Sequence, residues 1–250
     1  DGRTASRVEM VFALAAAGLT LYVIWRASRA YGGALVDALR AGQPHLFFSE
    51  EEPFGGFRQD AGAVTAAVRG MGNPDAAIRR VSAEILGHLA VPEATAALVN
   101  ALGDSDVMVR AASLRGLARS KATPALLEIA ASLRDPEPEV RLQAVDALRA
   151  LAGYPRGVTV HVEPLLADAD PKVRAHAALA LLRAGQHAEA QRTLRTMAKD
   201  ADPLVRAHAL DALGECADPD SFGLVAAALA DAQSPPVVRR SAASALVGID

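Results

Sequence analysis

The sequence predicts an all-α protein, namely a right-handed α-solenoid of about six helix pairs preceded by an apolar N-terminal helix. The first observation behind this prediction is repetition: residues 168–184, DADPKVRAHAALALLRA, return at residues 200–216 as DADPLVRAHALDALGEC. The second is that apolar residues recur at helical spacing within each copy. The third is that aromatic residues make up only 4% of the chain, and that only the short stretch GVTVHVE near Val160 alternates as a strand would. A fixed period of a few tens of residues is typical of proteins built by stacking similar units.

The N-terminal stretch from Val8 to Trp25 contains fifteen apolar residues out of eighteen. Eighteen helical residues extend about 27 Å, close to the thickness of a bilayer core. Tyr22 and Trp25 lie near one end, as interfacial anchors do, and Arg26 and Arg29 follow, which favours a cytoplasmic side for the rest of the chain. A signal peptide is disfavoured, because no small-residue cleavage site follows. The stretch is therefore either a transmembrane helix with a cytoplasmic solenoid or a helix of a soluble, cytoplasmic protein that caps the first repeat.

Residues 42–59 are predicted to link this N-terminal segment, residues 1–41, to the repeat region, residues 60–250. Three consecutive glutamates, Glu50 to Glu52, are flanked by four of the six phenylalanines of the chain. The segment is either a partner-binding peptide with aromatic anchors or a linker whose phenylalanines cover the open end of the first repeat.

Six copies of the motif follow, each marked by an arginine that recurs every 31–33 residues. These marker arginines are Arg79, Arg110, Arg141, Arg174, Arg206 and Arg239. In every copy a β-branched residue directly precedes the marker, a serine or alanine comes three residues after it, and a leucine comes seven residues after it. Because these positions lie one helical turn apart, each copy predicts an amphipathic helix whose small residue lets a neighbouring helix approach.

A turn rich in Asp, Asn and Pro precedes each of these helices, with acidic residues four and six positions before most markers. An aspartate there caps the helix by accepting backbone amide hydrogen bonds, and a proline fits the first helical turn. Another apolar periodic run precedes each turn, for example at residues 92–103. Each repeat is therefore predicted to be a helix, a tight turn and a second helix.

The acidic turn, followed by Val-Arg and then by Ala and Leu at helical spacing, resembles the HEAT-like repeat in the short, alanine-rich form also found in phycobilisome lyase subunits. The resemblance covers residues 60–250 and implies a ladder in which turn acids and helix arginines connect successive repeats. By resemblance this role passes to Asp106 with Arg110, Asp170 with Arg174, and Asp202 with Arg206. Two repeats depart from the pattern: Arg141 has Glu137 in place of the aspartate, and the sixth repeat has Pro235 there.

The N-terminal junction, residues 19–42, also resembles that of bacterial fusion proteins whose transporter half is of the nucleotide-translocase or major-facilitator type. This second resemblance implies that the solenoid is the cytoplasmic appendage of a membrane protein.

The chain carries no motif of an enzyme: no Ser, His and Asp signature, no glycine-rich phosphate loop after a strand, and no paired catalytic carboxylates. His176 and His208 occupy the same position in adjacent repeats, which suggests a metal site, but no carboxylate follows either histidine directly. Copying of the segment VRAHA explains the duplicate more simply. Cys216 is the only cysteine, so an intrachain disulfide is excluded. We expect no enzymatic activity, no metal and no cofactor.

Nucleic-acid binding is disfavoured by charge. Residues 60–250 contain 20 Lys and Arg residues against 23 Asp and Glu residues, whereas a phosphate-binding domain is expected to be clearly basic. The sequence favours a scaffold that presents its second helices to another protein or to the rest of its own membrane assembly. An alternative is a lyase-like subunit that handles a tetrapyrrole or another prosthetic group. The residues expected to contact a partner are Arg80, Glu84, Arg115, Arg119, Gln143, Arg149, Arg183, Asp211 and Glu215.

Overall fold

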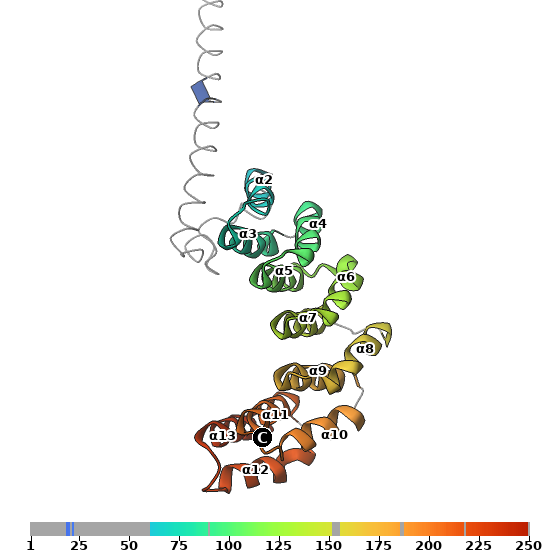
Figure 1. Cartoon of the computed structure of the whole chain (residues 1–250), viewed down its shortest axis with the longest axis vertical. Coiled ribbons are helices and arrows are strands. Elements are labelled where there is room, and N and C mark those ends of the chain that lie inside the picture. The colour runs from blue at the N-terminus through green and yellow to red at the C-terminus, as the bar shows by residue number, and fades with distance from the viewer. Residues whose placement is uncertain are drawn as a thin grey trace, which may run out of the picture.

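The computed structural model describes residues 61–89, 91–151, 156–185, 188–217 and 219–249, together with residues 19, 20 and 22. Every regular element within these residues is a helix, and the helices stack into an elongated solenoid (Figure 1). The predicted apolar helix from Val8 to Trp25 lies outside the described residues except for Leu19, Thr20 and Tyr22, as does the linker at residues 42–59. In the described ranges no helix combines the length and the hydropathy that crossing a bilayer requires.

The helices form successive pairs, each made of a first helix, a turn and a second helix. The pairs are α2 (Ala61–Gly70) with α3 (Ala76–His88), α4 (Pro92–Asn100) with α5 (Val107–Arg119), α6 (Leu126–Ala131) with α7 (Pro138–Ala150), α8 (Arg156–Val162) with α9 (Pro171–Arg183), α10 (Ala188–Met197) with α11 (Pro203–Cys216), and α12 (Phe222–Ala230) with α13 (Pro236–Ile249). Short 3-10 turns extend several first helices, among them Ala101–Gly103, Ser132–Arg134 and Glu163–Ala167. The all-helical solenoid predicted from the repeats is confirmed.

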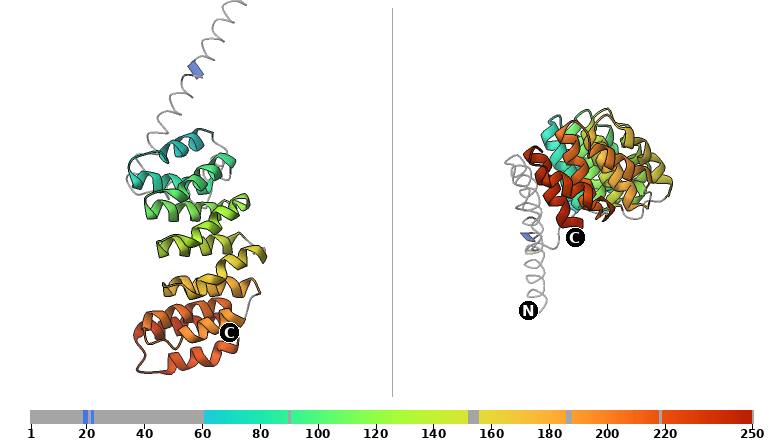
Figure 2. Two further views of the ribbon diagram at one scale, coloured as in Figure 1. Left: turned by 45° about the vertical axis from the view of Figure 1, so that its right-hand side comes forward. Right: turned by 90° about the horizontal axis from the view of Figure 1, so that it is seen from below.

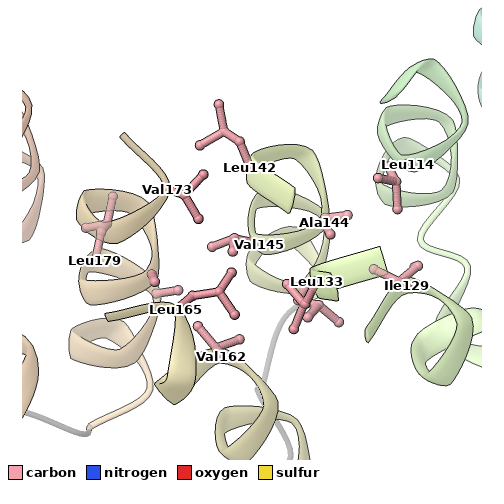
Figure 3. Packing of buried hydrophobic residues seen from close by; sticks show 14 of the residues in the cluster. Leu114, Ile129, Leu133, Leu142, Ala144, Val145, Val162, Leu165, Val173 and Leu179 are labelled. Atoms are coloured by element: carbon pink, nitrogen blue, oxygen red, sulfur yellow. The ribbon is translucent and has the colours of Figure 1, made fainter. Parts of the chain in front are cut away.

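The residues around Val160 are helical rather than extended, although their β-branched pattern is typical of a strand. Val162 at the end of α8 is fully buried, and it packs beside Leu165 and Val173 of the same repeat (Figure 3). Packing against the second helix therefore overrides the local β-propensity of this segment.

The two helices of each pair belong to two layers, and the left view of Figure 2 shows the pairs as one continuous stack. In Figure 1 the second helices follow the inner side of the arc and the first helices the outer side. The core lies between the layers and between successive pairs. Figure 3 shows Leu114, Ile129, Leu133 and Ala144 filling the space between α5, α6 and α7. The leucine seven residues after the marker is buried in the first five repeats, as the predicted stripe requires.

Aspartates cap most of the second helices. The Asp106 carboxylate accepts hydrogen bonds from the amides of Met108 at 2.9 Å and Val109 at 3.0 Å, and Asp170 caps α9 in the same way. Asp75 and Asp202 each accept one amide. Glu137, which occupies the equivalent position before α7 in the described part of the chain, makes no side-chain cap hydrogen bond. The longer glutamate side chain does not reproduce the aspartate geometry.

A ladder connects the first four repeats along their turns, but its pairs differ from the expected ones. Arg110 donates from Nε and Nη2 to both oxygens of Asp135 in the next repeat, at 2.8 and 2.9 Å. Arg79 with Asp104 and Arg141 with Asp168 are joined in the same bidentate way. The partner is therefore the acid six residues before the following marker. Asp106, Asp170 and Asp202, which lie four residues before their markers, instead cap their own helices.

Each ladder arginine also fixes its own turn. Nη1 of Arg110 donates to the carbonyl oxygen of Asp104 at 2.9 Å, while the amide of Glu137 donates to the Asp135 carboxylate at 2.9 Å. One ion pair thus ties together the turns of two repeats. Arg174 and Arg206 keep the bonds to their own turns, at 2.7 Å to Asp168 and Asp200. Among the described residues, however, no ion pair joins Arg174 to the next repeat.

Candidate interaction surface on the concave side

On the inner side of the arc, formed by the second helices, the side chains that follow the marker arginine by two, five or nine residues are exposed or half-buried in most repeats. These three positions on the second helices are called here the concave face. On α9 they are His176, Leu179 and Arg183. His176 is half-buried and Arg183 exposed, but Leu179 is buried, as are Ala177 and Leu181 in the core. Because the spacing is that of one helix face, successive repeats place these side chains in parallel rows.

Most of the residues expected to contact a partner lie on this face or beside it, and several pair with one another. Glu84 of α3 and Arg115 of α5 form an ion pair of 3.7 Å, with about a third of each side chain exposed. Gln143 donates to Glu139 within α7 at 3.1 Å. Of the other expected residues, Arg80 is half-buried, and Arg119 and Asp211 are exposed.

A denser group of charges joins α7, α9 and α11. Nδ1 of His176 lies 2.9 Å from Oδ1 of Asp146, and Arg149 lies 3.4 Å from the same oxygen. Arg149 also donates from Nη1 to Oε2 of Glu215 at 3.2 Å, across a separation of 66 residues. Arg183 of α9 donates to the backbone oxygen of Glu215 at 3.2 Å and approaches Oε2 at 3.5 Å. The sequence contains no periodic signal for this cluster, since it depends on the curvature that brings α7 and α11 together.

A groove of about 630 Å³ runs beside this cluster over α9, α11 and α13. Its floor consists of small residues such as Ala175, Ala212 and Gly214, and its rim carries His176 and His208. The histidines that occupy equivalent positions in the sequence therefore do line one groove. Within the described ranges, however, no group of three histidine, cysteine or acidic side chains is arranged to hold a metal ion.

His208 differs from His176 in its surroundings. Burial lowers the pKa of the His208 imidazole below its ordinary value, and the nearby charge of Asp211 opposes this effect only in part. Burial therefore favours the neutral imidazole, which can donate one hydrogen bond and accept another. The arrangement of the groove suits recognition of polar groups.

Comparison with known proteins agrees with the geometry of the helix pairs. The sequence matches the family model of HEAT repeats over residues 64–149 and 159–247. The structure is similar to that of Escherichia coli YibA, with 19% identity, coverage of 77% of this chain and 82% of that chain, and a TM-score of 0.55. No curated protein matches the sequence significantly.

Two further solved structures align with the chain at low identity. A chain from the complex of CpcE and CpcF of phycocyanin lyase from Nostoc aligns with 23% identity. The alignment covers 74% of this chain and 74% of that chain, with a TM-score of 0.49. An archaeal HEAT-like repeats protein from Thermococcus onnurineus aligns with 15% identity over 88% of this chain and 98% of that chain, with a TM-score of 0.48.

Proposed function

The chain belongs to the HEAT-repeat family, and we propose that it is a non-enzymatic scaffold that binds a partner protein along its concave face. One observation carries this proposal. The second helices, which follow the inner side of the arc, carry charged side chains such as Glu84, Arg115 and Arg183, next to a groove lined by small residues. A repeat protein uses such an extended concave surface to contact a partner with many side chains at once.

The charges of the concave face support recognition better than catalysis. They are arranged as complementary pairs, Glu84 with Arg115 and Asp146 with Arg149, at half-buried positions. Pairs of this kind contribute little stability to the fold, about 0–1 kcal/mol each, so that a partner exchanges them at low cost. Complementary charges of a partner protein would then fix its orientation on the solenoid.

Site-specific photo-crosslinking tests the proposal. A photoreactive amino acid replaces Arg119 or Asp211 on the concave face, and Leu127 of α6, which is 77% exposed on the outer layer, serves as the control position. We expect covalent adducts of one defined mass from the two concave positions in living cells and none from position 127. Adducts from position 127 alone, or none from the concave positions, would contradict the proposal.

We further propose that the solenoid is the cytoplasmic appendage of a membrane protein. This rests on the sequence alone, on the apolar stretch from Val8 to Trp25 and the arginines that follow it. Carbonate extraction of membranes tests it, by comparing the whole chain with a version that begins at Asp60. Resistance to extraction by the longer chain alone is expected. If both versions are released, the stretch does not anchor the protein.

A further inference from the structure

The strongest unexplained feature of the concave face is a carboxylate held by two arginines from two other repeats. Oε2 of Glu215 accepts from Arg149 of α7 at 3.2 Å and lies 3.5 Å from Nη2 of Arg183 of α9. The Glu215 side chain is 51% exposed, so this pairing is not part of the core. In a solenoid, each repeat normally contacts only its neighbours, yet this contact spans three repeats.

The two arginines belong to a longer series on the same face. Arg115 and Arg119 lie in the last two turns of α5, Arg149 in the last turn of α7, and Arg183 in the last turn of α9. These four residues are called here the arginine row. The row occupies three stacked helices, with two arginines on α5 and one each on α7 and α9. Neighbouring stacked helices lie about 8–10 Å apart, so the row offers at least one guanidinium group per helix at about that interval along the arc.

We propose, on the basis of the scaffold function proposed above, that the arginine row binds an acidic segment of the partner protein. Carboxylates of that segment take the places that Glu215 and Glu84 occupy in the structure. An extended chain advances about 3.3 Å per residue, so acidic side chains at every third residue match the spacing of the row. Guanidinium groups suit this role because they present a fork of donors that matches a carboxylate.

The exposure of the existing pairs makes this exchange favourable. The side chains of Arg115 and Arg183 are 34% and 46% exposed, so that their present pairs are solvated and weak. The exposed Arg119 side chain adds attraction. Glu215 thus acts as an internal competitor for the same two guanidinium groups.

An acidic peptide fits this face better than a nucleic acid does. Asp146 of α7 and Asp211 of α11 lie on the concave face close to the arginine row. A continuous phosphate backbone would be repelled by these carboxylates, whereas a peptide can carry neutral or basic residues opposite them. The net charge of −3 for the whole chain also opposes binding of a polyanion by long-range attraction.

Fluorescence anisotropy with a labelled peptide tests the proposal. The probe is an 18-residue peptide with glutamate at every third position and uncharged residues elsewhere, and the protein is the whole chain. We expect R183A and R119A each to weaken binding about fivefold and the double variant R149A/R183A to weaken it at least tenfold. E215Q, which removes the competing charge but keeps the size of the side chain, is expected to strengthen binding several-fold. R192A is the control, because Arg192 lies on the outer helix α10 and pairs with Glu189.

Two results would overturn the proposal. The first is that the peptide does not bind, or that R183A and R119A leave its affinity unchanged while the control R192A alters it. The other is binding of a single-stranded oligonucleotide of equal charge with the same affinity and the same loss in R183A, which would show general attraction of anions. Circular dichroism establishes whether each variant is folded. If R149A/R183A does not fold, the single variant R119A still tests the proposal. If the crosslinks from positions 119 and 211 persist when the peptide fails, only the acidic chemistry is refuted and the scaffold function stands.

Discussion

Arg110 and Asp135 are joined by two parallel hydrogen bonds of 2.8 and 2.9 Å that connect the second repeat to the third. About a tenth of each side chain is exposed, so the pair is largely shielded from water. The same arginine binds the carbonyl oxygen of Asp104 in its own turn at 2.9 Å. The pair therefore holds two turns in one geometry, and it contributes to the register of the whole stack.

We expect D135A to lower the free energy of unfolding by about 2 kcal/mol, because it leaves a shielded arginine without its anionic partner. Urea unfolding monitored by circular dichroism measures the effect. E189A is the matched control, since Glu189 pairs with Arg192 on the exposed surface of α10 at a similar distance of 2.9 Å. We expect that control to change stability by less than about 0.5 kcal/mol. Equal losses in the two variants would show that the ladder contributes no more than a surface pair.

Acid is expected to weaken the same ladder. The hydrogen bond from Arg79 lowers the pKa of the Asp104 carboxyl. Burial raises the pKa of the Asp135 and Asp168 carboxyls, but hydrogen bonds from an arginine and from a backbone amide, together with arginine charges, outweigh it. All three carboxyls therefore titrate below their ordinary pKa in the folded protein.

A carboxyl whose pKa is lower in the folded than in the unfolded chain stabilises the fold above the unfolded-state pKa of about 3.9. This stabilisation is lost as the pH falls through the folded-state pKa. We expect the melting temperature to be nearly constant from pH 7 to about pH 5 and then to fall steeply toward pH 3. The triple variant D104N/D135N/D168N, compared with wild type over the same range, should show a shallower fall. An unchanged slope would mean that other carboxyls cause the acid sensitivity.

The helix caps provide a comparison within one fold. Asp106 accepts two amide hydrogen bonds at the start of α5, whereas Glu137 at the start of α7 makes no side-chain cap bond. We expect D106A to cost about 1 kcal/mol of unfolding free energy and E137A to cost much less. Chemical denaturation of the two variants measures the difference. A loss in E137A as large as that in D106A would indicate that the charge of the turn, rather than the cap bond, is what stabilises these helices.

The helix pairs could be predicted from the sequence because their cause is local and repeated. A buried stripe, a capping acid and a turn recur every 31–33 residues, and each copy folds against the next. The ladder was harder to predict, since acids four and six residues before the marker are both near it in sequence. Only the structure shows that Arg110 extends toward the following turn and reaches Asp135.

The charge cluster of the concave face could not be predicted from spacing at all. Arg149 and Glu215 are 66 residues apart, and their contact follows from the curvature summed over three repeats. The sequence nevertheless indicated that both residues lie on the solvent-exposed side of their second helices, because helical periodicity separates that side from the buried stripe. Which of these side chains bind a partner stays a prediction, to be decided by the crosslinking and peptide experiments.

The close approach of α3 and α5 gives the last prediction. A Cβ atom at Gly87 would lie 2.5 Å from the Cα atom of Gly116, a distance at which the two helices must move apart. Alanine favours a helix over glycine by about 1 kcal/mol, but overpacking a buried contact costs about 1–3 kcal/mol, and backbone atoms cannot rotate away as a side chain does. We therefore expect G87A to destabilise the protein in urea unfolding.

The control for this prediction is G223A in α12, where a Cβ atom would meet no heavy atom of the described residues within 4 Å. There only the helix preference acts, so stability should be unchanged or slightly raised. If G87A were as stable as G223A, the first repeats could separate without cost. The spacing of α3 and α5 would then not be determined by their glycine contact, and the concave pair of Glu84 with Arg115 would have to adapt to a variable distance.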